Sequence, residues 1–230
     1  SKMKLKQDTL NEIAGKFVDA GVTERHVERE RSLYTDVYGI DPESPEEDVQ
    51  MLFDIAIQNR AWSLSPSEYR ALSEDFDPGE FLSCNSRKEA FNNIREIDDL
   101  GPKIANELLR KAVHVLQINE GWEKDLHVPL DTHVIKALVK TKAIDLEGEG
   151  WEDDLNKNPQ RVVNMDPDAN PRKLVGYTEL QDGFAEAASQ YDLPRITFDE
   201  LWVEHSRLIS NPLLQSESTL SELIRPRFEF

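Results

Sequence analysis

Cysteine is nearly absent from this sequence. The single thiol, Cys84, among 230 residues excludes an internal disulfide framework and any iron–sulfur or other metal cluster held by several thiolates. No apolar run approaches the length of a membrane span, and no pattern typical of a secretory signal peptide occurs. Period-two alternation of apolar and polar residues, the pattern of half-buried strands, is also missing. We therefore expect a soluble, cytoplasmic protein whose core is built from helices.

Basic residues are also few compared with acidic ones. The chain has 27 Lys and Arg against 45 Asp and Glu, a formal net charge of −18. Because phosphate contacts dominate the affinity of most nucleic-acid-binding proteins, this balance argues against a nucleic-acid partner. The alternative is that the acidity covers surfaces that face away from DNA, as in proteins from high-salt organisms. Acidic stretches at 41–48 and 147–154 lie apart from one group of basic residues in the sequence, which favours the alternative modestly. That group is Lys103, Arg110, Lys111, Lys136, Lys140 and Lys142.

Helical periodicity and capping residues predict an all-α fold. Ser44 followed by Pro45 and Glu47 is typical of a helix start, and Ser65 followed by Pro66 and Glu68 repeats the pattern. Asp77-Pro78-Gly79 reads as a loop or boundary. The predicted helices cover residues 4–20, 22–38, 45–58, 86–97, 103–118, 177–191 and 198–209, with one more beginning at 65–68. In the helix at 103–118 we expect Ile104, Leu108, Ala112 and Val115 to face inward. The acidic stretch 145–172 is expected to be an irregular connection.

Two segments carry residues suited to covalent chemistry. Ile97-Asp98-Asp99-Leu100-Gly101-Pro102-Lys103-Ile104-Ala105-Asn106 reads as the end of one helix, a tight hairpin and the start of a second helix. Pro129-Leu130-Asp131-Thr132-His133-Val134 places a carboxylate at the start of another. The positive end of a helix dipole disfavours the ammonium form of a lysine there, so its amine is a plausible nucleophile. An aspartate can stabilise a developing positive charge or move a proton.

Each of these two residues also has an ordinary interpretation. A lysine at an exposed helix start is usually only solvated. An aspartate in the context of Asp131 is a standard N-cap, and we expect Asp131 to fill that role in either case. The five histidines show no spacing typical of metal ligands.

The two segments together resemble the helix-hairpin-helix DNA glycosylase superfamily, which includes endonuclease III and the 8-oxoguanine DNA glycosylases. The superfamily pattern is Leu-Pro-Gly-Val-Gly-x-Lys-x-Ala and then Val-Asp-x-His, which appears here as 97–105 and 130–133. The resemblance covers residues 45–145 well and the remainder weakly. It implies a two-lobed HhH-GPD fold with the active site in the cleft between the lobes. Residues 45–145 would form a six-helix lobe, and 1–44 with 146–230 the second, discontinuous lobe.

The resemblance also implies roles for individual residues. Lys103 would attack the sugar and Asp131 would assist it. Contacts to DNA would come from Gln58, Asn59, Arg60, Leu100, Gly101, His133 and Lys136. A polar helix end is an equal interpretation for 58–60, and a structural hydrogen bond is the main expectation for His133. Trp62 is expected in the core.

One position of the hairpin departs from the superfamily pattern. Asp99 stands where the first glycine of the turn is expected. Its charge is unfavourable beside a phosphate, and a structural monovalent cation at the hairpin would offset it. No other cofactor is expected.

The function implied by the resemblance is excision of a damaged base from double-stranded DNA by an N-glycosylase with AP-lyase activity. An oxidised purine is the first expectation for the base. The protein would act as a monomer associated with a prokaryotic nucleoid. Two alternatives stay open: a non-catalytic helix-hairpin-helix module that binds DNA or protein, and a monofunctional glycosylase in which water replaces Lys103 as nucleophile.

Overall fold

The described part of the chain is all-α, as predicted. The computed structural model describes residues 4–40, 43–58, 64–98, 100–146, 161–168 and 173–204. Within these ranges the regular elements are helices, and the only β-type pairings are two isolated bridges, Leu5 with Ile144 and Val163 with Val175. Asn59, Arg60, Trp62 and Asp99 lie outside the described residues. No helix in the described ranges is long and apolar enough to cross a membrane.

The chain forms two compact units. Unit 1 comprises residues 1–23 and 130–230, and unit 2 comprises residues 24–129. One unit is therefore continuous and the other discontinuous, but these boundaries differ from the 45 and 145 expected from the sequence. The difference at the first boundary arises because helix α2 (Val22–Asp36) is bonded to helix α7 (Pro102–His114). In that contact the Arg110 guanidinium donates to both carboxylate oxygens of Glu30, at 2.9 and 3.0 Å.

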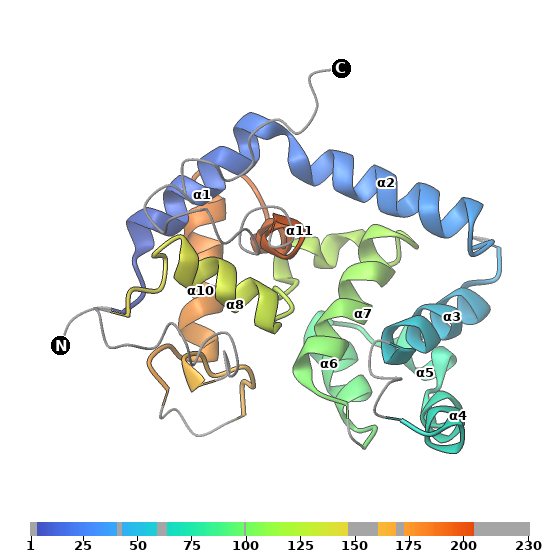
Figure 1. Ribbon diagram of the computed structural model, residues 1–230. Helices are drawn as coiled ribbons and strands as arrows, with labels where there is room; N and C mark the ends of the chain where they lie inside the picture. Colours follow the sequence, from blue (N-terminus) through green and yellow to red (C-terminus); the bar gives the residue numbers. More distant parts are fainter. Residues whose placement is uncertain are drawn as a thin grey trace. The chain divides into compact units, whose positions relative to one another are not determined.

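Unit 1 is built around two helices that lie side by side, α1 (Gln7–Ala20) and α10 (Tyr177–Ser189) (Figure 1). The short helix η4 (Arg195–Asp199) packs against both. Phe198 contributes an aromatic ring to this core: it stacks on Phe184 at 4.6 Å and meets Phe17 edge-on at 5.6 Å. Gly183 allows the close approach of α1 and α10, because an added Cβ would lie 3.0 Å from Leu10 Cδ1. Helix α8 (Thr132–Lys140) packs against α11 (Glu200–Glu204) in the same unit.

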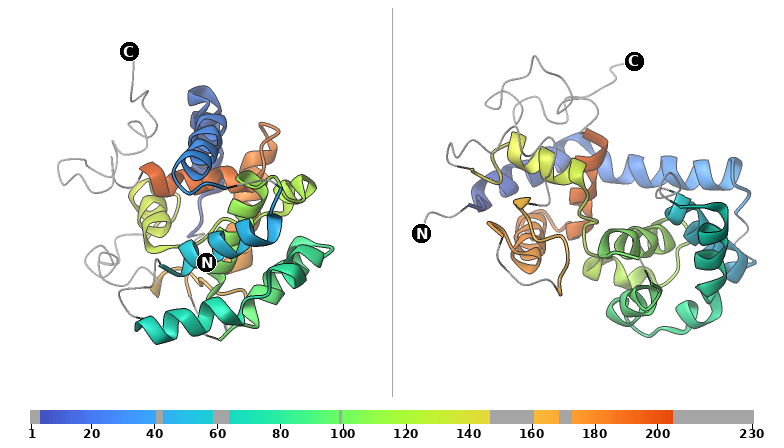
Figure 2. Two further views of the ribbon diagram at one scale, coloured as in Figure 1. Left: turned by 90° about the vertical axis from the view of Figure 1, so that its right-hand side faces the viewer. Right: turned by 60° about the horizontal axis from the view of Figure 1, so that its bottom comes forward.

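Helix α7 contributes a large part of the core of unit 2. Helices α3 (Pro45–Gln58) and α6 (Arg87–Arg95) contact α7 directly, and the short helix η2 (Glu120–Asp125) follows it (Figure 2). Helices α4 (Pro66–Asp75) and α5 (Pro78–Ser83) complete the unit against α3. The four side chains predicted to face inward are all buried, three in α7 and one at its C-cap: Ile104, Leu108, Ala112 and Val115. The residues between them are largely buried as well, so α7 is enclosed on more than one face.

Local capping chemistry explains where several helices begin. The predicted capping box of α4 is present: Ser65 Oγ accepts from the Glu68 amide at 3.2 Å, and Glu68 Oε2 accepts from the Ser65 amide at 2.6 Å. The loop or boundary predicted at 77–79 is present as a boundary, because α4 ends at Asp75 and α5 begins at Pro78. Asp77 caps helix α5, its carboxylate accepting from the Glu80 amide at 3.0 Å, with Pro78 in the first turn. An Asp-Pro pair fits a turn and a helix start equally well, and here the following apolar Phe81 is buried.

Helix α7 ends earlier than predicted. It extends to His114 rather than residue 118, because Gln117 and Asn119 adopt left-handed backbone conformations with φ of 58° and 50°. The segment from 117 to 126 contains helix η2 at Glu120–Asp125.

Candidate catalytic residues

The hairpin between α6 and α7 presents Lys103 at the start of a well-packed helix. Leu100 is buried, and its amide donates to the Ile97 carbonyl at 3.4 Å, which closes the turn. Gly101 is the N-cap of α7 with φ −83° and ψ 170°, and Pro102 occupies the first turn. A Cβ at Gly101 would meet no protein atom within 4 Å. The lack of a side chain here therefore leaves the backbone open to an external group, whereas the buried Leu100 side chain is directed into the core.

Lys103 is the second residue of α7, and its side chain is 39% exposed. Its Nζ lies 3.9 Å from Oε2 of Glu107, one helical turn further on. The first turn of α7 contains no acidic residue, so the four amide groups at this helix end and Lys103 share a positive field. An amine in this position is accessible to a ligand and needs only a change of rotamer to leave its carboxylate partner.

A cluster behind Lys103 was not foreseen from the sequence. Oε1 of Glu107 lies 3.3 Å from Nζ of Lys111, which is buried and stands over the Tyr34 ring at 5.5 Å. Burial alone would lower the pKa of Lys111, but attraction to Glu107 and Tyr34 outweighs it, and the pKa is raised. Lys111 is therefore a permanent cation. The spacing Lys103, Glu107, Lys111 at intervals of four is the sequence signal that could have revealed the cluster.

Two members of the basic group near the motif cannot bind phosphate. Arg110 is buried and paired with Glu30, and Lys111 is buried against Glu107. Burial raises the pKa of Glu30, but the charge and hydrogen bonds of Arg110 outweigh it, so the pKa is lowered and the pair stays ionised. Burial lowers the pKa of the neighbouring His114 to about 4. These side chains fix α2 to α7, and the basic surface suggested by the sequence is correspondingly smaller.

Asp131 is the N-cap of α8 in unit 1, as predicted. Its Oδ1 accepts from the amides of His133 and Val134 at 2.8 and 2.9 Å, and the residue is 8% exposed. Both capping bonds use the same oxygen, so Oδ2 takes no part in the cap. The chain leaves unit 2 at Pro129, so Asp131 is the second residue of its unit after that crossing. A buried carboxylate held by two amides has a fixed orientation and one oxygen outside the cap.

Two predicted DNA contacts lie on α8 near Asp131. The His133 ring meets Trp202 edge-on, with 6.5 Å between ring centroids, and the Trp202 side chain is half exposed. Lys136 is half-buried on the same helix. The packing of α8 on α11 within unit 1 therefore brings His133 to Trp202, and Asp131 accepts from the His133 amide.

The end of α3 holds only part of the third predicted segment. Gln58 is exposed, and its Nε2 donates to the hydroxyl of Tyr69 at 3.4 Å. Asn59 and Arg60 lie outside the described residues. The position of Gln58 is therefore compatible with both predictions, a polar helix end and a contact to a ligand.

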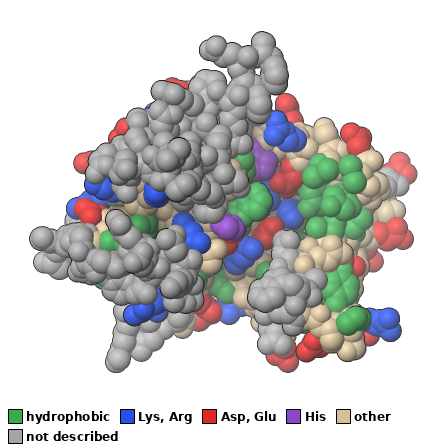
Figure 3. All heavy atoms as spheres, in the orientation of Figure 1, with side chains coloured by type: hydrophobic (Ala, Val, Ile, Leu, Met, Phe, Trp, Pro, Cys, Tyr) green, Lys and Arg blue, Asp and Glu red, His purple; other side chains and the backbone are tan. Residues whose placement is uncertain are grey.

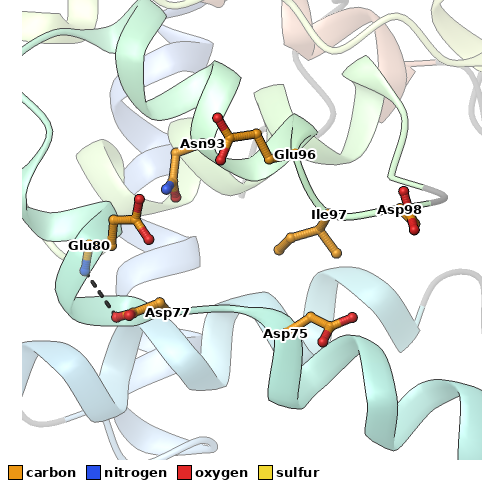
Figure 4. Close-up of a pocket in the computed structure, with 7 residues that line it drawn as sticks. All are labelled: Asp75, Asp77, Glu80, Asn93, Glu96, Ile97 and Asp98. Carbon is orange, nitrogen blue, oxygen red and sulfur yellow. Dashed lines mark hydrogen bonds between the residues drawn. The ribbon is translucent and has the colours of Figure 1, made fainter.

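An acidic cavity of about 260 Å³ lies in unit 2 beside the hairpin (Figure 4). Ile97 and Asp98 of the hairpin line it together with Asp75, Asp77, Glu80, Asn93 and Glu96. Within the described ranges, no group of three or more His, Cys, Asp or Glu side chains is arranged to hold a metal ion. On the face drawn in Figure 3, Lys and Arg side chains of the described residues lie among acidic ones. Phosphate contacts at the hairpin would thus depend on backbone amides and Lys103 rather than on a broad positive field.

Comparison of the chain with known protein families, with curated proteins and with solved structures found no match.

Proposed function

We propose that this protein is a DNA N-glycosylase with AP-lyase activity, built on a two-lobed HhH-GPD fold, which removes a damaged base from double-stranded DNA. The observation that supports the proposal most is the placement of Lys103. It follows a helix, a tight turn and a glycine N-cap, and its amine is accessible at the positive end of α7. An oxidised purine is the substrate class we put first.

The proposed reaction begins with a nucleotide flipped out of the duplex, because C1′ cannot be reached in the base stack. The lone pair on Nζ of Lys103 forms a bond to C1′ while the bond from C1′ to the base breaks. The base leaves with that electron pair and takes up a proton. The C1′–O4′ bond then opens to give a Schiff base on Lys103, and loss of a C2′ proton with departure of the 3′ phosphate nicks the strand.

Asp131 has a separate part in the proposal. Positive charge develops on the sugar as the base leaves, and a carboxylate with a fixed orientation stabilises it without having to reorganise. Oδ2, which is outside the cap, is the oxygen available for this role, while Oδ1 holds the start of α8. The proposal requires Lys103 and Asp131 to act on the same sugar.

The test is covalent trapping by borohydride on a panel of duplexes carrying single lesions. Borohydride reduces a Schiff base to a stable amine, so the proposal predicts a protein–DNA adduct with at least one lesion and none with undamaged duplex. An abasic-site duplex serves as the positive control for lyase chemistry. If no duplex were trapped, the abasic one included, the proposed AP-lyase activity would be refuted.

A second candidate function is favoured by the acidic cavity. Carboxylates at Asp98, Glu96 and Asp75 beside the hairpin repel phosphate, and together with the net charge of −18 they suit a helix-hairpin-helix module that binds a basic protein segment without catalysis. Such a module would neither trap on abasic DNA nor bind a duplex at moderate salt, so the same panel separates the two functions.

A further inference from the structure

Glu107 has an unusual environment for a carboxylate on a helix surface. Its Oε2 is buried, and within the described residues no group donates a hydrogen bond to it. The Lys103 ammonium lies 3.9 Å from this oxygen, a distance too long for a hydrogen bond. A buried acceptor without a donor costs free energy. A function at this position would explain why the cost is tolerated.

Lys111 holds the other oxygen of the same carboxylate. Its Nζ lies 3.3 Å from Oε1 and is fixed from behind by the Tyr34 ring. The charge of Glu107 is therefore already balanced by a buried cation before Lys103 is counted. Lys111 thus holds Oε1 of Glu107 in place, and Oε2 faces Lys103. Because Lys111 already balances the negative charge of Glu107, the carboxylate attracts the Lys103 ammonium only weakly.

We propose that Glu107 is the general base that activates Lys103, and this inference rests on the proposed glycosylase function. In the step we assign to it, Oε2 takes a proton from the Lys103 ammonium, which leaves a neutral amine and a neutral carboxylic acid. The amine then attacks C1′, and the departing base recovers the proton from Glu107. Protons and charges balance, because the sugar gains a secondary ammonium on Lys103 and the base leaves neutral. The 3.9 Å separation closes by rotation of the half-exposed lysine side chain, as is common when a catalytic pair tightens on substrate binding.

The test compares Glu107→Gln with a matched control. Glutamine keeps the shape and still offers an oxygen to Lys111, but its amide cannot accept the proton. The control, Glu28→Gln, removes one negative charge from an exposed position of α2 in the same unit. The rate of borohydride trapping on the preferred lesion duplex at pH 7 is expected to fall about 10²-fold in Glu107→Gln and to stay near the wild-type value in the control.

A pH profile separates a base from a merely structural carboxylate. The ammonium groups of Lys103 and Lys111 face the Glu107 carboxylate, and Tyr34 and Arg110 act in turn on Lys111. In Glu107→Gln the proton must leave to solvent, so trapping should recover as pH rises from 7 to 9 while wild type changes little. Affinity for a duplex with a non-reactive abasic analogue should match the control.

Glu107→Asp provides a second variant should Glu107→Gln fail to fold. Aspartate keeps the negative charge beside Lys111 but is one methylene shorter and cannot reach both lysines as Glu107 does, so trapping should fall about tenfold or more. Wild-type trapping rates in Glu107→Gln, or in Glu107→Asp if the first variant is unfolded, would overturn the role of Glu107 and leave the glycosylase proposal intact. Absence of trapping by the wild-type protein itself would overturn both.

Discussion

Replacement of Asp131 separates its two proposed contributions, the helix cap and the catalytic charge. In the structure one oxygen, Oδ1, accepts both capping bonds, from His133 and Val134. Asn keeps an oxygen in that place and ranks with Asp as an N-cap, so Asp131→Asn should change the free energy of unfolding by no more than a few tenths of a kcal/mol. Asp131→Ala removes the cap and leaves two amides without their acceptor, at a cost of about 1–2 kcal/mol.

Excision should follow the opposite pattern. Both variants remove the negative charge, so both should lose about 10²-fold in the single-turnover rate of base release, which corresponds to about 2.7 kcal/mol of transition-state stabilisation. Urea unfolding and single-turnover kinetics on the preferred duplex measure the two quantities independently. If Asp131→Asn kept wild-type kinetics, or lost activity only in proportion to lost stability, Asp131 would be a cap and nothing more.

Two further predictions follow from charge. Asp99→Gly restores the turn residue of the superfamily pattern and removes a negative charge from the hairpin. A duplex with an abasic analogue should therefore bind more tightly to this variant, as measured over a salt series. Weaker binding with the fold intact would show that Asp99 serves another purpose, such as holding a cation. His114 has a pKa lowered by burial from 6.5 to about 4, so the unfolded chain binds a proton more readily than the folded one, and stability should fall as pH drops from about 6.5 to 4. At 1.36 kcal/mol per pKa unit, the free energy of unfolding should fall by about 3 kcal/mol over this range. His114→Gln should flatten that part of the curve of unfolding free energy against pH. An unchanged slope would show that other groups cause the loss.

Local sequence patterns predicted most of the helices because capping and periodicity act over a few residues. Ser65 with Glu68 formed the expected capping box, Asp131 formed the expected N-cap, and the four side chains expected to be buried at 104–115 are buried. Asp77-Pro78-Gly79 marked the boundary between α4 and α5, but not that Pro78 and Gly79 already belong to α5, because Asp-Pro suits turns and helix starts alike. The late end predicted for α7 arose because left-handed conformations at Gln117 and Asn119 were not foreseen for residues other than glycine.

Long-range pairing explains the rest. The placement of α2 in unit 2 depends on Glu30 meeting Arg110, 80 residues apart in the chain, and no local pattern reports such a pair. The same pairing turned Arg110 from a candidate phosphate ligand into a buried structural residue. The sequence did not point to Glu107 because its proposed role depends on which of its two oxygens Lys111 contacts. The four-residue spacing of Lys103, Glu107 and Lys111 could nevertheless have indicated that the three side chains lie on one face of the helix.

The measurement that tests the central claim most directly is identification of the residue that becomes attached to DNA. Wild-type protein is trapped on abasic or lesion-bearing duplex with borohydride, digested, and the modified peptide is sequenced by mass spectrometry, with Lys103→Gln examined alongside. We predict modification on Lys103 alone and no adduct from a folded Lys103→Gln variant. Attachment at another residue, or equal trapping by Lys103→Gln, would contradict the assignment of Lys103 as the nucleophile.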